Sequence, residues 1–218
     1  MLGQQDGRRG IGKFANGVVL DIGCGDRWAE NVLPPHTVYL GLDYPATVSL
    51  GYSGRPDVFA DARRLPLAKE SVDTVLLMDV LEHLPEPEAA IAEASRILKP
   101  GGILIVQVPF LYPLHDEPYD FQRWTIHGLQ GLLQRHKFNI LESSTQGEPL
   151  ETAAALAVIA MAKGILDGAS HRTLVILLAP LLLIGIPLVN LAGWLFARLL
   201  PRSSLMPLGY RMVAAKVK

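Results

Sequence analysis

The sequence has a single cysteine, Cys24, among its 218 residues. One cysteine excludes an internal disulfide and any zinc site built from several cysteines. Charged residues are also scarce, at 19% of the chain, against a usual share of about a quarter. The 20 basic residues nearly balance the 21 acidic ones, so the formal net charge is -1. Because nucleic-acid-binding proteins need a basic surface, we predict no nucleic-acid partner.

The beginning of the chain lacks the pattern of a secretory signal. Arg8 and Arg9 are not followed by the apolar stretch that such a signal requires. Hydrophobic residues make up 50% of the chain, which excludes intrinsic disorder because enough apolar surface is present to offset the entropy lost on folding. We therefore expect a cytoplasmic protein whose length suits one α/β domain with an added segment.

Short apolar runs recur along the chain and alternate with helical patterns. They predict strands at 18–22, 38–42, 58–60, 72–78 and 103–108, followed by two closing strands at 138–144 and 210–217. Runs that are apolar on both faces and are separated by helices indicate a parallel sheet that is covered on both sides.

Two helices are marked by the spacing of their apolar residues. One begins near Pro87 and is stopped by the sequence Lys99-Pro100-Gly101-Gly102. The other follows Thr125, whose side chain is a suitable N-cap.

The strongest chemical signal is the run VVLDIGCGD at residues 18–26. Gly23 and Gly25 follow a predicted strand and allow the backbone to approach a ligand closely. The carboxylates of Asp21 and Asp26 flank this turn, and their charge would repel the pyrophosphate of a dinucleotide. They favour a cationic ligand such as S-adenosylmethionine, which carries an ammonium and a sulfonium group. The alternative is a tight strand-to-helix turn without a ligand.

Two further carboxylates follow the next predicted strands. Asp43 can accept hydrogen bonds from both hydroxyls of a ribose, and its neighbour Tyr44 could cover an adenine face. Asp61, followed by Ala62, could accept from the adenine amino group. Because the carboxyl ends of parallel strands share one edge of the sheet, these acids are expected to face the crevice where open sheets bind ligands.

The pieces VLDIGCGD, GLDY, DARRLPLAKESVDTVLLMDVLEHL and RILKPGGILIVQVP occur in order between residues 17 and 109. Together they resemble the class I S-adenosylmethionine-dependent methyltransferases of the kind called methyltransferase type 11. The resemblance implies a Rossmann-like α/β fold with a seven-stranded sheet whose last strand runs antiparallel. It also implies S-adenosylmethionine as cofactor, and we predict no metal ligands. The cofactor residues expected from it are Asp21, Gly23, Cys24, Gly25, Asp43, Tyr44, Asp61, Ala62, Met78 and Asp79.

Two segments offer groups for the methyl acceptor. His115 lies in an aromatic-rich segment after the 103–108 run, and His83 follows the 72–78 run. We predict His115 as the favoured general base and His83 as the second candidate, with Tyr119 and Arg123 positioning the acceptor. A base is needed only for a poorly ionised hydroxyl, since transfer from a sulfonium mainly requires alignment. The structural alternative is that these side chains only pack the helix and anchor the loop.

Residues 147–208 differ in character from the rest. The stretch 174–197 has no charged residue and would be about 36 Å long as one helix, which exceeds the roughly 30 Å hydrocarbon core of a bilayer. Pro180, Pro187 and Asn190 are expected to interrupt it. The preceding limb at 152–166 is too short to span comfortably. We therefore predict a shallow membrane hairpin with its tip at 167–172.

The two parts lead to one prediction of domains and function. We expect a methyltransferase domain over 1–146 plus 209–218 and an apolar helical insertion over 147–208. The predicted function is methyl transfer to a small or lipid-linked acceptor, such as a quinone, a lipid or a polysaccharide precursor. It takes place at the inner face of the cell membrane, with membrane contact through 152–200.

Two alternatives remain open at this point. One is a soluble metabolite as acceptor, with the insertion serving as a lid or a homodimer interface. The other is a non-catalytic, membrane-docked binding module that keeps the fold.

Overall fold

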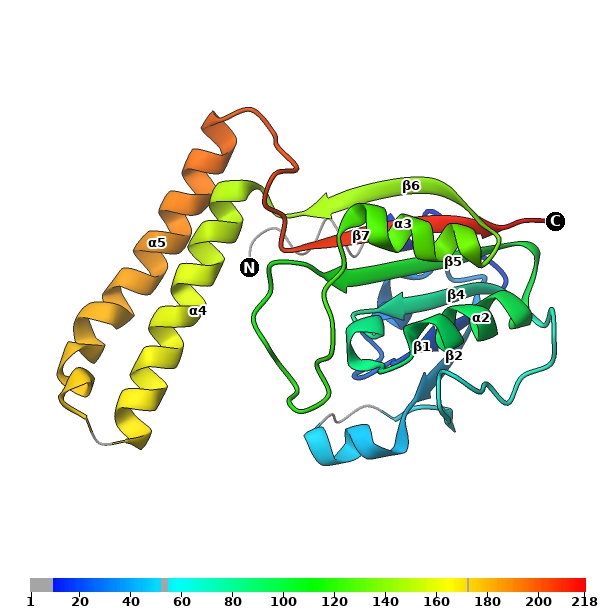
Figure 1. Ribbon diagram of the computed structural model, residues 1–218, viewed down its shortest axis with the longest axis horizontal. Coiled ribbons are helices and arrows are strands. Elements are labelled where there is room, and N and C mark those ends of the chain that lie inside the picture. Colours follow the sequence, from blue (N-terminus) through cyan, green and yellow to red (C-terminus); the bar gives the residue numbers. More distant parts are fainter. Residues whose placement is uncertain (1–9, 52–54, 172) are drawn as a thin grey trace. The chain divides into compact units, whose positions relative to one another are not determined.

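The computed structural model describes residues 10–51, 55–171 and 173–218 (Figure 1). Residues 1–9, with the two arginines on which the predicted absence of a secretory signal rests, lie outside this part of the chain. The chain divides into two compact units, which are described separately. The first unit comprises Met1–Phe110, Leu114–Ser144 and Gly209–Lys218, and the second comprises Leu111–Pro113 and Thr145–Leu208.

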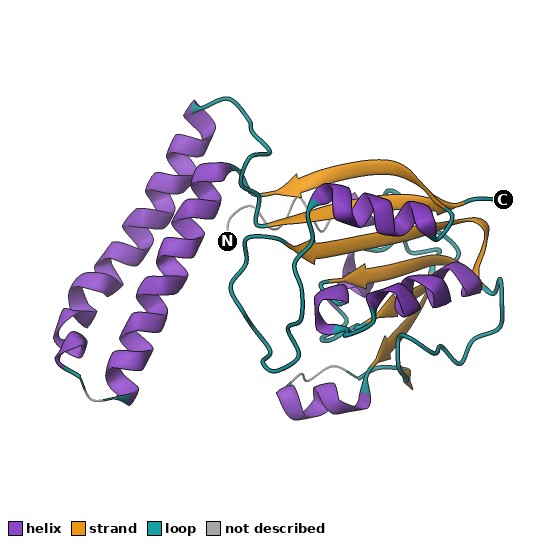
Figure 2. Cartoon of the chain, in the orientation of Figure 1, coloured by secondary structure: helices purple, strands orange, loops and turns teal. Residues whose placement is uncertain are grey.

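The first unit is built on a mixed sheet, drawn as orange arrows in Figure 2. Its strands among the described residues are β1 (Val18–Ile22), β2 (Val38–Asp43), β3 (Val58–Phe59), β4 (Val72–Met78), β5 (Leu98–Pro109), β6 (Phe138–Gln146) and β7 (Gly209–Lys216). They lie in the order β3-β2-β1-β4-β5-β7-β6. Strands β1 to β5 pair in parallel, whereas β7 runs antiparallel to β5. The predicted seven-stranded Rossmann-like sheet with an antiparallel last strand is confirmed.

Alternate residues of the central strands pack into different layers. In β4, Val75 and Leu77 belong to a core cluster that also includes buried residues of the helices at 87–97 and 126–135. Leu76 and Met78 join a second cluster with Ile11 and other residues near the start of the described chain. Since successive side chains of a strand point to opposite faces, continuous apolar runs require cover on both sides of the sheet.

The helices of this unit confirm some boundaries and correct others. Helix α2 (Pro87–Ile97) ends before Lys99 as predicted, but the chain enters β5 directly at Leu98. Helix α3 (Ile126–Arg135) begins at the predicted N-cap, where the hydroxyl of Thr125 accepts a hydrogen bond from the backbone N–H of Gly128 at 3.1 Å.

The connections around β2 are shorter than the helical patterns suggested. Only the 3-10 turns η1 (Trp28–Val32) and η2 (Pro45–Leu50) are described there. Pro34 and Pro35 follow η1 closely. Proline lacks the backbone donor that a longer helix would need and restricts the residue before it. A third 3-10 turn, η3 (Leu81–His83), follows β4.

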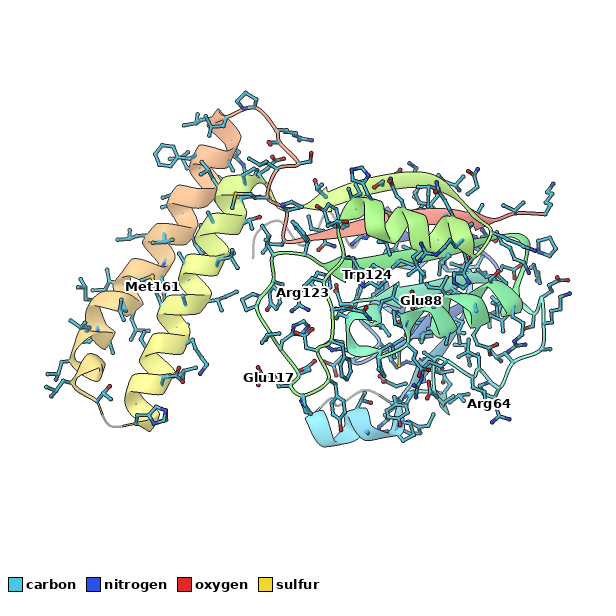
Figure 3. The ribbon with its side chains drawn as sticks, in the orientation of Figure 1. Arg64, Glu88, Glu117, Arg123, Trp124 and Met161 are labelled. Atoms are coloured by element: carbon cyan, nitrogen blue, oxygen red, sulfur yellow. The ribbon has the colours of Figure 1, made fainter. Side chains whose placement is uncertain are left out.

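The second unit contains two long helices that lie side by side (Figures 1 and 2). Helix α4 (Pro149–Ser170) is followed by the turn η4 (Leu174–Leu178) and by helix α5 (Ala179–Leu199). Met161 of α4 (Figure 3) packs against Gly185 of α5. A Cβ on Gly185 would lie only 2.9 Å from the methyl carbon of Met161. Small residues therefore let these two helices approach closely.

Two predictions about this unit are wrong. The first helix of the hairpin was predicted to cover 152–166, but α4 has 22 residues and ends at Ser170. It therefore includes Asp167, which was predicted to begin the turn between the two helices. The ion pair between Lys163 and Asp167, four residues apart, supports the added turn. Helix α5 also continues through Pro187, although Pro180 does mark its first turn.

Helices α4 and α5 are the two in the described residues that are long and apolar enough to cross a membrane. Their mean hydropathies are 1.5 and 1.9. Within the structure only 6% of the α5 window is buried, and large side chains such as Leu181 and Ile184 are more than half exposed. Length and composition thus mark α4 and α5 as candidate membrane-spanning helices.

Candidate functional site

The glycine turn directly follows β1 and has a backbone that only glycine suits. Gly23 and Gly25 both have positive φ angles, of 71° and 47°. A Cβ on Gly23 would lie 2.5 Å from Cγ2 of Val80, the second residue after β4. The N–H of Gly23 donates to the carbonyl of Leu42 at 2.8 Å, which ties the turn to β2. The turn therefore keeps backbone, without a side chain, at the carboxyl edge of the sheet.

Asp21 is a buried carboxyl at the end of β1, with 2% of its surface exposed. The hydroxyl of Tyr39 donates a hydrogen bond to it at 2.7 Å. Burial nevertheless raises the pKa of Asp21 to about 7, because the apolar surroundings disfavour the charged form. Burial also raises the pKa of Cys24 to about 12, which makes this thiol an inert part of the turn.

Asp43, at the end of β2, braces the glycine turn. Its carboxylate accepts hydrogen bonds from the backbone N–H of Gly25 at 2.9 Å and of Tyr44 at 2.8 Å. It accepts a third from the hydroxyl of Thr47 at 3.1 Å. The side chain of Tyr44 is half exposed. The structure therefore brings Asp43 and Gly25 together as predicted, while the proposed contact of Asp43 with a ribose stays a prediction.

The acid after β3 is engaged by a neighbouring arginine. Nη2 of Arg63 lies 2.7 Å from Oδ2 of Asp61, and this pair lowers the pKa of Asp61. Ala62, between them, is buried. The adenine role predicted for Asp61 stays a prediction, and a ligand amino group would have to compete with Arg63 for the carboxylate.

Two charged residues near the turn were missed by the sequence reasoning. Arg27 has a positive φ of 57° and places Nη1 2.9 Å from Oδ2 of Asp57. The same oxygen accepts from the N–H of Gly41 at 2.8 Å. Arg27 is thereby held over the ring of Tyr39, 4.8 Å from its centre. The segment that follows Arg27 is the five-residue 3-10 turn η1.

A chain of hydrogen bonds crosses the carboxyl ends of β4 and β5. Asp79 follows the buried Met78 and accepts from Nε2 of Gln107 at 2.6 Å. Oε1 of Gln107 in turn accepts from Nη2 of Arg211 in β7 at 2.5 Å. Asp79 is therefore fixed at the same sheet edge as the glycine turn, and its expected place near the cofactor stays a prediction.

The two predicted histidines lie together at this edge. The rings of His83 and His115 are nearly perpendicular, with centres 4.8 Å apart. The contact arises because the N–H of Phe121 donates to the carbonyl of Glu82 at 2.9 Å, which ties the 114–124 segment to η3. The sequence suggested each histidine separately, and the structure shows that they form one cluster.

Arg123 and Tyr119 belong to the surroundings of this cluster. Arg123, beside Trp124 on the segment that leads into α3 (Figure 3), forms a two-point pair with the buried carboxylate of Asp120. This pair lowers the pKa of Asp120 to about 2. The carbonyl of Tyr119 lies 2.8 Å from Nδ1 of His83, while its side chain is half exposed. Their predicted role in positioning the acceptor stays a prediction.

Glu82 was missed, although it stands beside His83 in the sequence. Its side chain is fully buried, and among the described residues neither carboxylate oxygen has a hydrogen-bond partner. Burial raises the pKa of Glu82 to about 9, and the nearby charge of Asp79 adds to the effect. An acid between Leu81 and His83 carries no signal of burial by itself, because short turns usually lie at the surface.

Comparison with known proteins finds a match to a family of methyltransferases. Residues 20–106 match the family described as methyltransferase domain. A protein of Mycolicibacterium smegmatis described as a probable S-adenosylmethionine-dependent methyltransferase is 35% identical over 96 residues, which cover 42% of this chain and 37% of that protein. A ubiquinone biosynthesis O-methyltransferase of Paracidovorax citrulli is 35% identical over 96 residues, covering 38% of this chain and 40% of that protein.

The solved structures extend the likeness of the fold to the whole chain. An S-adenosylmethionine-dependent methyltransferase from Archaeoglobus fulgidus covers 99% of this chain and 93% of its own, with a TM-score of 0.60 and 16% identity. The chain spans less than half of the length of the curated relatives that it matches. With the sheet order, the glycine turn and the matched segment in agreement, residues 20–106 belong to the class I S-adenosylmethionine-dependent methyltransferase domains, which confirms the predicted family and its cofactor.

Proposed function

We propose that this protein transfers a methyl group from S-adenosylmethionine to an oxygen of a lipid-linked or quinone-like acceptor. The observation that carries the proposal is the glycine turn between two buried carboxylates, Asp21 and Asp43. A side chain on Gly23 would fill the space against Val80, so the turn keeps open backbone. Carboxylates and open backbone suit a ligand that is cationic and carries hydroxyl and amino groups.

The chain's own residues would divide the work of binding. When bound, S-adenosylmethionine supplies a methyl group on a positively charged sulfur. Asp21 would be ionised by such a cation, because an opposite charge offsets the effect of burial on its pKa. Asp43 would exchange one of its present loop contacts for a ribose hydroxyl. Buried Met78 and Ala62 would exclude water from the ligand.

The acceptor would meet the cluster of His83 and His115. These imidazoles lie at the carboxyl ends of β4 and β5, beyond the same edge as the glycine turn. One of them can take the proton of an acceptor hydroxyl, and such proton transfer contributes about 10²–10⁴-fold to a rate. The ubiquinone relative acts, by its name, in the biosynthesis of a lipid-soluble quinone. An apolar acceptor that carries a hydroxyl group would suit both the histidine pair and the likeness to the ubiquinone relative.

The apolar helices support a membrane location for this reaction. As helices of 22 and 21 residues, α4 and α5 are about 33 and 32 Å long, which matches a hydrocarbon core of about 30 Å. We propose that they enter the membrane as a two-helix hairpin, so that β6 and β7 remain on one side. The full length of α4 replaces the shallow hairpin that the shorter limb had suggested.

The ends of these helices that adjoin β6 and β7 carry residues typical of a membrane interface. The guanidinium carbon of Arg198 lies 3.8 Å from the ring centre of Trp194. Nη1 of the same arginine lies 3.6 Å from Oε1 of Glu151 in α4. Tryptophan and arginine are favoured at the level of lipid headgroups. Arg198 and Glu151 therefore place charge where such a hairpin would leave the bilayer on the side of β6 and β7.

Cofactor binding is tested first, by calorimetry of the full-length protein with S-adenosylhomocysteine. We expect saturable binding, and we expect Gly23→Val to lower the affinity more than a hundredfold because the new side chain meets Val80. Gly164→Ala is the matched control, since nothing lies within 4 Å of that Cβ. Absence of binding by the folded wild type would contradict the proposed function.

The acceptor is tested with labelled S-adenosylmethionine and two extracts, one of total lipids and one of soluble metabolites. We expect label to enter the lipid fraction only. Label in soluble metabolites would favour the alternative with the helices as a lid or dimer interface. Binding without any transfer would favour a non-catalytic module.

A further inference from the structure

Three groups that can ligate a metal ion meet beyond the ends of β4 and β5. Ligand atoms of Glu82, His83 and His115 all lie within 4.8 Å of one another. Two of these residues belong to η3, and His115 comes from the segment that follows β5. The sequence analysis predicted no metal ligands, and its single cysteine excluded only a zinc site built from several cysteines.

Both imidazoles are held through the same ring nitrogen. Nδ1 of His83 lies 2.8 Å from the carbonyl oxygen of Tyr119, and Nδ1 of His115 lies 3.2 Å from Oδ2 of Asp120. An acceptor at Nδ1 favours the tautomer that carries its proton there and its lone pair on Nε2. A metal-ligating histidine almost always has such a carboxylate or carbonyl behind it. Both histidines are thus oriented as ligands are.

Glu82 supplies an independent observation. Its carboxyl group is fully buried, and neither of its oxygens has a hydrogen-bond partner among the described residues. Oε1 lies 3.9 Å from Nε2 of His83, so it faces the histidine pair. A buried carboxylate without a partner is costly in free energy, and a cation between it and the imidazoles would remove that cost.

The surroundings add negative charge. Oδ2 of Asp116 lies 4.0 Å from Nε2 of His83. Arg123 is positive, but it is engaged at two points by Asp120. The acids around the cluster therefore attract a cation to it.

We propose that Glu82, His83 and His115 bind one divalent transition-metal cation. Two imidazoles and one carboxylate suit Zn²⁺, Mn²⁺ or Fe²⁺ rather than Ca²⁺ or Mg²⁺, which prefer oxygen ligands only. Ligand atoms around a tetrahedral cation with bonds of about 2.1 Å lie about 3.4 Å apart. Side-chain rotations that move these atoms inward by about 1 Å would complete the site.

Three protein ligands leave a coordination position open, as in catalytic metal sites. If the proposed function holds, this position would take the acceptor oxygen and lower the pKa of its hydroxyl. The bound cation would then replace the histidines as the group that promotes loss of the proton, because their Nε2 atoms would be occupied as ligands. The metal site itself does not depend on that reaction, so it is tested by binding alone.

The test uses the untagged full-length protein, freed of metal by a chelator and titrated with Zn²⁺ or Co²⁺. We expect one equivalent to bind, Zn²⁺ to raise the melting temperature, and Co²⁺ to give visible ligand-field absorption. Glu82→Gln and His115→Ala should each weaken Zn²⁺ binding at least tenfold. His36→Ala is the matched control, because His36 is an exposed histidine outside the cluster, and it should leave binding unchanged.

Two results would overturn the proposal. One is the absence of Zn²⁺ and Co²⁺ binding at millimolar metal by protein that still binds S-adenosylhomocysteine. The other is binding that both Glu82→Gln and His115→Ala leave intact, since the cation would then lie elsewhere. Glu82→Gln keeps the shape of the side chain, so this variant remains informative if His115→Ala fails to fold. Metal binding without methyl transfer would leave the metal site standing and contradict only the proposed function.

Discussion

The two compact units place the same kinds of apolar side chain in different surroundings. In the first unit Leu20, Leu76 and Leu104 are completely buried between the sheet and its covering layers. In the second unit Leu181 and Leu188 of α5 are 69% and 60% exposed. Burying a leucine contributes about 1.5–3 kcal/mol, so the first unit gains its stability from its own core. The second unit carries an apolar surface that is not buried within the unit itself, which is typical of an interaction surface or a membrane segment.

The largest expected effect concerns charge on α5. A lysine near the centre of a membrane helix costs about 2.5–3.5 kcal/mol. Ile184→Lys combined with Leu188→Lys should therefore lower the membrane-bound fraction more than a hundredfold, as measured by flotation with vesicles. Leu141→Lys, at a similarly exposed leucine of β6, is the matched control and should float like the wild type. Unchanged flotation of the double variant would contradict a membrane hairpin.

The second prediction compares leucine truncation in the two units. Leu104→Ala should lower the free energy of unfolding by about 2–5 kcal/mol, because it leaves a cavity in a packed core. Leu188→Ala should change it by less than about 0.5 kcal/mol in detergent, since that side chain is exposed. Denaturant unfolding measures both. Equal losses would mean that α5 packs in a core of its own, as in a dimer.

The third prediction separates function from stability at Asp21. The carboxyl ionises near pH 4 in the unfolded chain but near pH 7 in the folded protein. The unfolded state therefore loses its proton first, and the folded protein loses up to roughly 4 kcal/mol of stability as the pH rises from 4 to 7. Asp21→Asn removes this penalty. Its melting temperature should exceed that of the wild type at pH 8 and approach it near pH 4.

The same variant should bind S-adenosylmethionine more weakly, because the negative charge opposite a cation is gone. Asp167→Asn is the control, as a carboxyl of α4 outside the candidate site. A variant that is neither stabilised at pH 8 nor impaired in binding would show that Asp21 does not act as a buried acid.

The smallest effect is expected at the start of α3. Thr125→Ala removes the acceptor for the N–H of Gly128 and should lower stability by about 1 kcal/mol. Thr125→Ser keeps the hydroxyl and should recover most of the loss. If thermal unfolding finds no difference between the two variants, the cap does not contribute in the first unit.

The strands were the most predictable part of the fold. The bounds of β1 and β4 agree with the predicted runs at both ends, because residues such as Val19 and Leu76 belong to uninterrupted apolar stretches. The lengths of the helices were less predictable. Helix α4 extends to Ser170 through the pair of Lys163 and Asp167, a contact that no apolar pattern reveals.

The candidate site was also predictable only in part. Gly23, Gly25 and Asp43 could be grouped from the sequence, since the carboxyl ends of parallel strands meet at one edge. The partners of these residues could not. The pair of Arg27 and Asp57 and the cluster of His83 with His115 join residues that are far apart in the sequence.

The apolar runs, the glycine turn and the charge-free stretch at 174–197 predicted a parallel sheet with a ligand turn and an apolar helical segment, and the resemblance to methyltransferases added the seven strands with an antiparallel last one. These features are local, and local patterns fix the type of each element. Only the tertiary structure decided that Glu82 is buried without a partner beside two histidines, and that the leucines of α5 remain exposed. Burial and pairing depend on contacts between distant segments, so they exist only after the chain has folded.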